Sequence, residues 1–111
     1  KGRRLQQWFR DLLIEKLNIH TEDIESRSMG AGGEDLIMSR SARHHFPYSI
    51  ECKNVEKLNV WEAYKQAKEN SKNYEPLVVM KKNNQKALVV LDAEHFVQIY
   101  QDWTHDVTNK D

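Results

Sequence analysis

The centre of the chain carries the segment Tyr48-Ser49-Ile50-Glu51-Cys52-Lys53-Asn54, which is typical of a β-strand. Side chains alternate between the two faces of a strand. One face then carries the apolar side chains of Tyr48, Ile50 and Cys52. The other face carries a carboxylate, Glu51, and an ammonium group, Lys53. Charges on an otherwise apolar strand are costly to bury unless they are paired or bind a metal ion. This strand is therefore the first candidate for a functional site.

The composition indicates one globular domain, residues 1–111, with a single core. The chain is 39% hydrophobic and 31% charged, and its length suits one core but not two. Lys and Arg number 17 and Asp and Glu also number 17, so the formal net charge is zero. A neutral chain does not coat nucleic acid through bulk charge. Any contact with DNA must therefore come from a local basic surface.

Cysteine usage and hydropathy exclude several classes of protein. The single cysteine, Cys52, excludes an internal disulfide and a zinc cluster built from cysteines. No apolar run approaches the roughly 18 residues that a membrane helix needs, and the sequence shows no signal peptide. We therefore expect a cytoplasmic protein that does not associate with membranes.

Hydrophobic periodicity predicts three helices. The first covers residues 2–18, with Gln6 at the edge of its apolar stripe. The second covers 60–72, and Asn59 is its expected N-cap. The third begins after Asp92 and carries an apolar face, and it is followed by a frayed tail over 104–111. On the second helix we expect an inner face made by Trp61, Tyr64 and Ala67.

Five segments are predicted to be strands: 23–29, 35–39, 48–54, 77–80 and 87–91. The last two are continuous apolar runs, which are typical of strands covered on both faces. The resulting order is α-β-β-β-α-β-β-α. It indicates an α/β fold with a mixed central sheet flanked by helices.

The second and third predicted strands are expected to form a hairpin. If its loop is symmetric and centred near Arg43, Asp35 lies directly opposite Glu51. Opposed residues project from the same face, with β-carbons about 4.5–5.5 Å apart. Glu34 then faces away by alternation and is expected at the surface.

Two neighbouring carboxylates beside a lysine suit the hydrolysis of a phosphodiester. That reaction needs an activated water, a neutralised transition state and a stabilised leaving oxygen, and a divalent metal held by oxygen ligands can supply all three. Mg²⁺ prefers one or two carboxylates, which Asp35 and Glu51 would provide, and the Cys52 carbonyl could add a backbone ligand. Lys53 could position the water or stabilise the pentavalent phosphate. A Glu-x-Lys pair alone is a weak signal, because an exposed, salt-bridged strand also produces it.

Four motifs in order carry a family resemblance: Gly2 before a helix, Arg27-Ser28-x-Gly30, Asp35-Leu36 and Ile50-Glu51-Cys52-Lys53. Over nearly the whole chain the sequence resembles the PD-(D/E)xK nuclease superfamily, and within it the archaeal-type Holliday junction resolvases and small phage nucleases. The resemblance implies a restriction-endonuclease-like α-β-β-β-α-β core, here with an extra strand and a C-terminal helix.

The resemblance also implies roles for single residues. Asp35 and Glu51 would be metal ligands and Lys53 the catalytic lysine. Arg27 and Ser28 would lie near the scissile phosphate, and a helix residue that faces the site in many members would be Gln66. Resolvases of this type place a glutamate where this chain has Gln6, and an amide can orient a water molecule but brings no charge.

The expected DNA contacts are basic or hydroxyl side chains around the mouth of the site, because such groups position a duplex through its backbone. They are Arg3, Arg4, Arg27, Ser28, Arg40, Arg43 and Lys57. For Arg40, Arg43 and Lys57 ordinary surface charge is an equal alternative. The lysines of the last turn, Lys81, Lys82 and Lys86, are expected to be solvated.

The sequence therefore predicts a Mg²⁺-dependent DNA endonuclease, a phosphodiester hydrolase in which Mn²⁺ could replace Mg²⁺. The resemblance points to branched DNA, such as a four-way junction, cut by a homodimer, and to a phage-encoded protein acting in the host cytoplasm. The apolar last helix is a candidate dimer surface. The alternative is a non-catalytic or weakly catalytic DNA-binding or assembly module with the same fold. Gln6 and the zero net charge favour that alternative.

Overall fold

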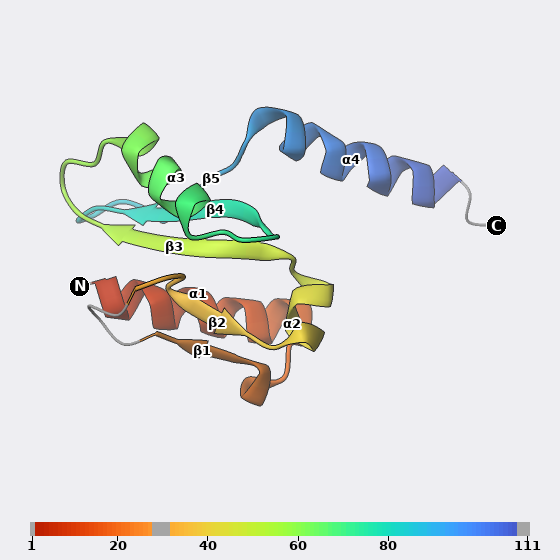
Figure 1. Ribbon diagram of the computed structural model, residues 1–111, viewed down its shortest axis with the longest axis horizontal. Helices are drawn as coiled ribbons and strands as arrows, with labels where there is room; N and C mark the ends of the chain where they lie inside the picture. The colour runs from red at the N-terminus through yellow and green to blue at the C-terminus, as the bar shows by residue number, and fades with distance from the viewer. Residues whose placement is uncertain (1, 28–31, 109–111) are drawn as a thin grey trace.

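The computed structural model describes residues 2–27 and 32–108 and shows a mixed α/β architecture. A three-stranded mixed sheet and a separate antiparallel pair of strands are flanked by helices (Figure 1). In chain order the elements are α1 (Gly2–Leu17), η1 (Thr21–Asp23), β1 (Ile24–Ser26), β2 (Leu36–Met38), α2 (Arg40–His45), β3 (Tyr48–Asn54), α3 (Val60–Glu69), β4 (Glu75–Lys81), β5 (Leu88–Val90) and α4 (Ala93–Thr108).

The helix α1 forms the expected amphipathic first element. Its residues Leu5, Phe9 and Leu13 recur at helical spacing and are buried in the main core, where α1 contacts β1 and β3. The helix ends at Leu17, where Asn18 takes a left-handed backbone conformation (φ 56°). Asparagine tolerates that conformation, so it is a suitable residue to terminate a helix.

The main sheet has the order β3-β4-β5, with β3 parallel to β4 and β5 antiparallel to β4. The central strand is covered on both faces, as expected. Val79 packs into the core on the α1 side, and Val78 packs against Ala63 and Ala67 of α3. The same expectation was wrong for β5, which forms the edge of the sheet and leaves Leu88 about half exposed. A strand is covered on both faces only where other elements pack on each face. At the edge of the sheet, β5 has fewer such neighbours than β4.

The predicted hairpin between the second and third strands was wrong. Strand β2 pairs instead with β1, with Ser26 opposite Leu36, and the helix α2 lies between β2 and β3. The local cause is Ser39, whose Oγ accepts a hydrogen bond from the Ala42 N–H at 3.1 Å and caps α2. Asp35 nevertheless reaches β3, because its N–H donates to the Ile50 carbonyl at 3.0 Å.

The helix α3 begins as predicted, because Asn59 Oδ1 accepts a hydrogen bond from the Glu62 N–H at 3.1 Å. It ends at Glu69 rather than at residue 72. The predicted inner face was wrong for Trp61, which is 84% exposed. The buried face consists of Ala63 and Ala67, which are four residues apart and small enough to bring the helix close to β4.

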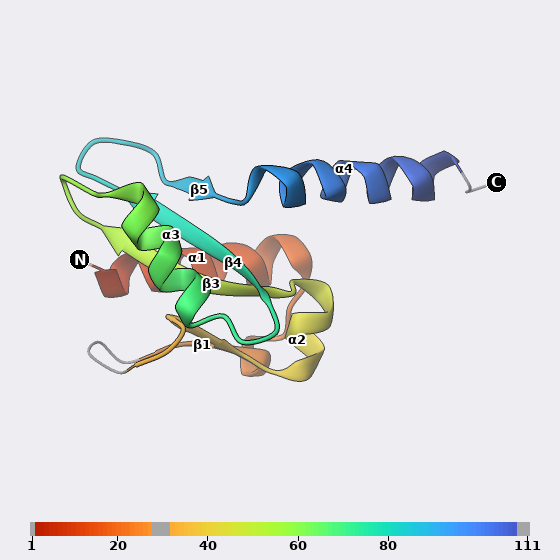
Figure 2. The same ribbon diagram turned by 45° about the horizontal axis from the view of Figure 1, so that its top comes forward.

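The helix α4 extends away from the sheet in both views (Figures 1 and 2). Its predicted N-cap is confirmed, because Asp92 Oδ2 accepts a hydrogen bond from the His95 N–H at 2.9 Å. The predicted fraying was wrong over 104–108, where the helix continues and the Thr108 hydroxyl donates to the Thr104 carbonyl at 2.7 Å. Residues 109–111 lie outside the described part. In the part of the chain that the structure describes, no helix is both long and apolar enough to span a membrane.

Candidate active site

The charged face of β3 turns toward α3, and its two charges contact each other. Glu51 is paired in register with Val78, which packs under α3, and its side chain is only 6% exposed. The Lys53 Nζ lies 3.7 Å from the Glu51 Oε2. The strand thus holds a nearly buried carboxylate beside a partly exposed ammonium group, as the alternation of its sequence predicts.

Asp35 reaches the same strand from the loop before β2. Its Oδ2 accepts a hydrogen bond from the Cys52 N–H at 2.6 Å. In an extended strand the N–H and the C=O of one residue point to the same edge. The Cys52 carbonyl therefore points to the edge at which the Asp35 carboxylate lies. The Cys52 side chain itself is buried in the main core, on the other face of the strand.

The surroundings of the two carboxyl groups disfavour their ionised forms. Burial raises the pKa of Asp35 and of Glu51 above the ordinary range, and the charge of Asp35 raises the pKa of Glu51 further. The Cys52 N–H and the charges of Lys53 and Arg27 lower the pKa of Asp35 but do not cancel the effect of burial. Two desolvated carboxylates that repel each other create a site where a cation would be strongly favoured.

The donor atoms at this edge fit a hard divalent cation. Among residues 2–27 and 32–108, no three histidine, cysteine, aspartate or glutamate side chains are arranged to hold a metal ion. The oxygens of Asp35 and Glu51, with the Cys52 carbonyl beside them, are the type of ligand that Mg²⁺ accepts. Mg²⁺ usually keeps several waters and needs only one or two carboxylates. The residues present therefore suit Mg²⁺ or Mn²⁺ and do not suit a zinc centre.

The side chain that contacts Glu51 from the end of α3 is that of Asn70, the C-cap residue, which was not among the predicted site residues. The Asn70 Nδ2 donates to the Glu51 Oε1 and to the Gly33 carbonyl, both at 3.4 Å. Gln66, one turn earlier, is exposed and lines a groove of ≈ 520 Å³ together with Lys53. Gln66 lies four residues before Asn70, about one helical turn away, and its expected role at the site stays a prediction.

The Gln6 side chain of α1 forms a hydrogen bond with β1. Its side chain is buried, and the Oε1 accepts a hydrogen bond from the Ser26 hydroxyl at 2.5 Å. An amide at this position therefore ties α1 to β1.

Arg43 and Glu34 form a mostly buried ion pair, which corrects two expectations. The Arg43 Nη1 and Nη2 donate to the two carboxylate oxygens of Glu34 at 3.0 and 2.7 Å. Their side chains are only 11% and 14% exposed. The Arg43 guanidinium also lies over the Tyr74 ring, 4.3 Å from its centroid. Glu34 is therefore not a surface residue, and Arg43 is committed to structural contacts instead of being available to DNA.

Arg27 lies close enough to Asp35 for its charge to lower the pKa of that carboxyl group, and it also supports the backbone. Its Nε donates to the Glu34 carbonyl at 2.5 Å. Gly33 has a positive φ of 91°, and a β-carbon there would approach the Arg27 guanidinium to 3.4 Å. Arg27 and Arg43 together fix the segment that delivers Asp35. Ser28 lies outside the described residues.

One of the remaining expected DNA contacts, Arg40, lies apart from Lys57. Arg3, Arg4, Arg40 and Lys57 are all exposed. Arg40 begins α2, before the start of β3, whereas Lys57 follows the end of β3 (Figure 1). Because β3 separates them, these two residues lie at opposite ends of the strand. The expected ring of basic residues is therefore divided.

Comparison with protein-family models, with curated proteins and with solved structures finds no match to this chain. The function must therefore be argued from the residues and their geometry.

Proposed function

We propose that this protein is a metal-dependent DNA endonuclease of the PD-(D/E)xK type, with a restriction-endonuclease-like fold. The observation that supports the proposal most is the proximity of two carboxylates at β3: the Asp35 Oδ2 accepts a hydrogen bond from the Cys52 N–H at 2.6 Å, the charge of Asp35 raises the pKa of Glu51, and the Lys53 Nζ lies 3.7 Å from the Glu51 Oε2. A buried carboxylate, Glu51, and a half-buried one, Asp35, both with raised pKa values, are unfavourable in a purely structural role, whereas metal binding would stabilise them.

The side chains have separate roles in the proposed reaction. Asp35, Glu51 and the Cys52 carbonyl would hold Mg²⁺ or Mn²⁺, which when bound supplies an activated water and neutralises charge on the phosphate. Lys53 places a positive charge where negative charge develops on the phosphate. Asn70 orients the Glu51 carboxylate by a hydrogen bond to Oε1. Arg27 adds a second positive charge near Asp35.

The proposed enzyme acts as a homodimer, and α4 is the proposed contact between the copies. Phe96, Tyr100, Trp103 and Val107 are spaced by four, three and four residues, so they form one stripe along the helix. Each of the four is at least half exposed, and within α4 no residue is buried. A stripe of aromatic and aliphatic side chains on a projecting helix is costly to leave in water.

The spacing of the stripe favours a second copy as the occupant. The spacing of four, three and four residues is the same from either end of the stripe. A two-fold axis at the midpoint of the stripe therefore pairs it with the same stripe of the second copy. Tyr100 then meets the Trp103 position of the other copy, and Phe96 meets the Val107 position. Such an isologous contact would give two paired active sites. Paired sites suit a two-fold symmetric branched DNA, such as a four-way junction. The proposed setting is the host cytoplasm, with a phage-encoded protein.

Cleavage of a panel of labelled DNA tests the proposal. Single strand, duplex, flap and four-way junction are each incubated with Mg²⁺ or with EDTA. The wild-type protein is compared with Glu51→Gln and with the control Glu25→Gln, which changes an exposed acid on β1. We expect metal-dependent, paired cuts in the junction that Glu51→Gln abolishes and Glu25→Gln retains. Wild-type cleavage by Glu51→Gln would disprove the assignment. Cutting of duplex or flap alone would keep the chemistry but reject the junction as substrate.

The second candidate is a DNA-binding or assembly module with the same fold and little or no catalysis. The neutral Gln6, which is engaged with Ser26, and the zero net charge favour it. This candidate predicts binding of the junction in EDTA and no cleavage of any substrate with Mg²⁺.

A further inference from the structure

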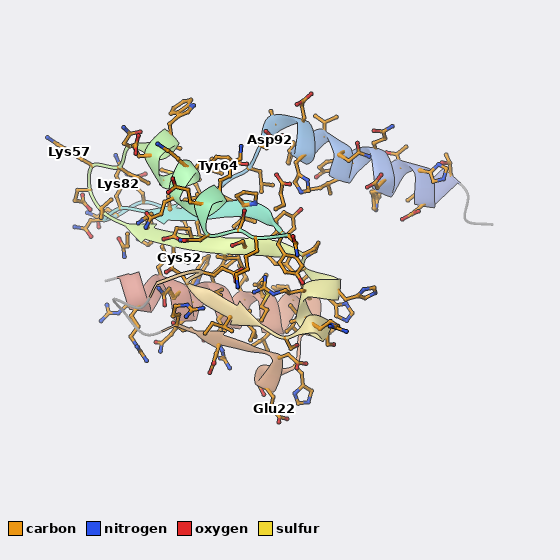
Figure 3. The ribbon with its side chains drawn as sticks, in the orientation of Figure 1. Glu22, Cys52, Lys57, Tyr64, Lys82 and Asp92 are labelled. Atoms are coloured by element: carbon orange, nitrogen blue, oxygen red, sulfur yellow. The ribbon has the colours of Figure 1, made fainter. Side chains whose placement is uncertain are left out.

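Four lysines line one groove at the end of the sheet. The segment after β3 and the turn between β4 and β5 enclose a groove of ≈ 620 Å³. Its cationic lining residues are Lys57, Lys81, Lys82 and Lys86. Figure 3 shows Lys57 and Lys82 at the same end of the molecule. We call this feature the lysine groove.

Backbone contacts fix the two walls of the lysine groove. The Glu56 Oε2 accepts a hydrogen bond from the Asn83 N–H at 2.7 Å, and the Val55 N–H donates to the Lys81 carbonyl at 3.1 Å. The acidic side chain of this region, Glu56, is thereby used to tie one loop to the other. In the described ranges 2–27 and 32–108, none of the four lysines has a carboxylate within ion-pair distance.

The lysine groove is continuous with the candidate active site. It shares Val55 and Leu58 with the groove that contains Lys53. On its other side it shares Lys81 and Lys86 with a third groove, which contains Arg4 and Trp8. A hollow therefore runs from Lys53 around the end of the sheet to α1. Its cations are concentrated in the lysine groove, whereas Glu62 and Glu69 also line the section that contains Lys53. The lysine groove itself suits an anionic ligand.

We propose that the lysine groove binds the phosphate backbone of a DNA arm that leaves the active site. This inference rests on the proposed function, because DNA is taken as the substrate. Lysine presents a compact positive charge, which suits phosphate oxygens and reads no base edge. The groove would hold the DNA at a distance from the carboxylates, so binding through it would need no metal ion. The turn lysines thus have a role that solvation alone does not explain.

A salt titration of DNA binding in EDTA tests the inference. The triple variant Lys57→Gln/Lys82→Gln/Lys86→Gln removes three exposed charges and leaves Lys81, which also donates to the Lys82 carbonyl. The control Lys16→Gln/Lys68→Gln/Lys72→Gln removes the same charge from exposed positions outside the lysine groove. Binding of a fluorescent duplex of roughly 30 base pairs is measured by anisotropy from low to moderate salt, and thermal unfolding verifies that both variants fold.

We expect the groove variant to lose roughly tenfold or more in affinity at low salt. The slope of log K against log salt should fall by about 2 to 3, since each phosphate contact contributes about 0.9. The control should keep the wild-type slope. Equal slopes for the groove variant and the control would overturn the inference, as would a wild-type protein that binds no DNA.

The outcome also separates the inference from the proposed function. Lysine-dependent binding without any cleavage would retain the lysine groove and reject the nuclease. Cleavage by a protein whose DNA binding is insensitive to these lysines would retain the nuclease and reject the groove. Insensitivity to these lysines would also direct attention to an acidic protein segment as the occupant.

Discussion

Glu51 is nearly buried in β3, and the charges around it are one cation and a second carboxylate. The Lys53 Nζ at 3.7 Å gives only a loose ion pair. Asp35 opposes that gain and raises the pKa of Glu51. The repulsion between the ionised Asp35 and Glu51 carboxylates therefore remains unfavourable until a cation binds.

Replacement of Glu51 by Gln should stabilise the metal-free protein. Because folding raises the pKa of Glu51, its favourable contribution to stability is present below the unfolded pKa and is lost as the pH rises through the folded pKa. Above about pH 4.3 the wild type therefore loses stability relative to Glu51→Gln. At pH 7 we expect the variant to be more stable by on the order of 1 kcal/mol.

Urea unfolding in EDTA at pH 4 and pH 7 measures this difference, with Glu25→Gln on β1 as the exposed control. A wild type that is more stable than Glu51→Gln at pH 7 would show that Lys53 and Asn70 already compensate the charge.

The ion pair between Arg43 and Glu34 should be a major structural contact. Arg43→Met leaves the Glu34 carboxylate mostly buried without its partner, and we expect a loss of about 3 kcal/mol in the free energy of unfolding. Arg40→Met, at an exposed position on the same helix, should change stability by less than about 0.5 kcal/mol. Denaturant unfolding compares the two. If Arg43→Met unfolds like wild type and instead binds DNA poorly, the original expectation of a DNA contact would be correct.

At the scale of elements, local signals in the sequence predicted most of the fold. The alternation around Glu51 gave the charged face of β3, and side-chain oxygens at Asn59 and Asp92 gave the starts of α3 and α4. These signals act within a few residues, so they can be read without tertiary structure. Glu51 and Lys53 were placed on one face by the same alternation, whereas Asp35 was placed by a hairpin register that the structure does not have.

Features that depend on distant partners were not predictable. The symmetric hairpin failed because Ser39 caps α2, and β2 found a partner in β1. The burial of Glu34 depends on Arg43, nine residues away and on another element. Asn70 entered the site because α3 ends one turn earlier than its periodicity indicated. Each error concerns which surfaces meet, and periodicity alone does not contain that information.

The attachment of α4 to the sheet depends on one residue of its first turn. The Tyr48 hydroxyl and the His95 Nε2 lie 2.6 Å apart and share a hydrogen bond, and the His95 Nδ1 lies 3.8 Å from the Glu75 Oε1. Tyr48→Phe removes the hydroxyl while keeping the ring that packs against Phe46. We expect amide hydrogen exchange to accelerate several-fold over the first turns of α4 and to stay unchanged in β3 and β4.

Hydrogen-exchange mass spectrometry resolves these segments, and Tyr74→Phe, which keeps the ring beneath Arg43, is the matched control. Unchanged exchange in α4 after Tyr48→Phe would show that other contacts hold the helix.

At the scale of the whole molecule, the projecting helix makes the protein elongated. The principal extents are 47 × 30 × 29 Å, and α4 extends beyond the body in both views (Figures 1 and 2). A standard protein interface buries roughly 800 Å² on each partner. The exposed apolar side chains of α4 can contribute much of that area, because each large aromatic buries about 150–250 Å². The shape thus favours association through α4.

The double variant Tyr100→Glu/Trp103→Glu should convert the proposed dimer into a monomer. Sedimentation velocity should give twice the mass of the chain for wild type and a single mass for the variant, because the charges would be desolvated at the centre of the contact. Trp61→Glu places a charge on a more exposed tryptophan outside α4 and should remain dimeric. A wild-type protein that is monomeric at high micromolar concentration would contradict the proposed dimer.

Calorimetric titration of Mn²⁺ into the metal-free protein probes the proposed metal site itself. It needs no knowledge of the substrate, so a wrong choice of DNA cannot obscure the result. We predict saturable binding to wild type and to Glu25→Gln, and loss of that binding in Asp35→Asn and in Glu51→Gln. Saturable binding that survives both substitutions, or a folded wild type that binds no Mn²⁺ at millimolar concentration, would contradict a metal site at Asp35 and Glu51.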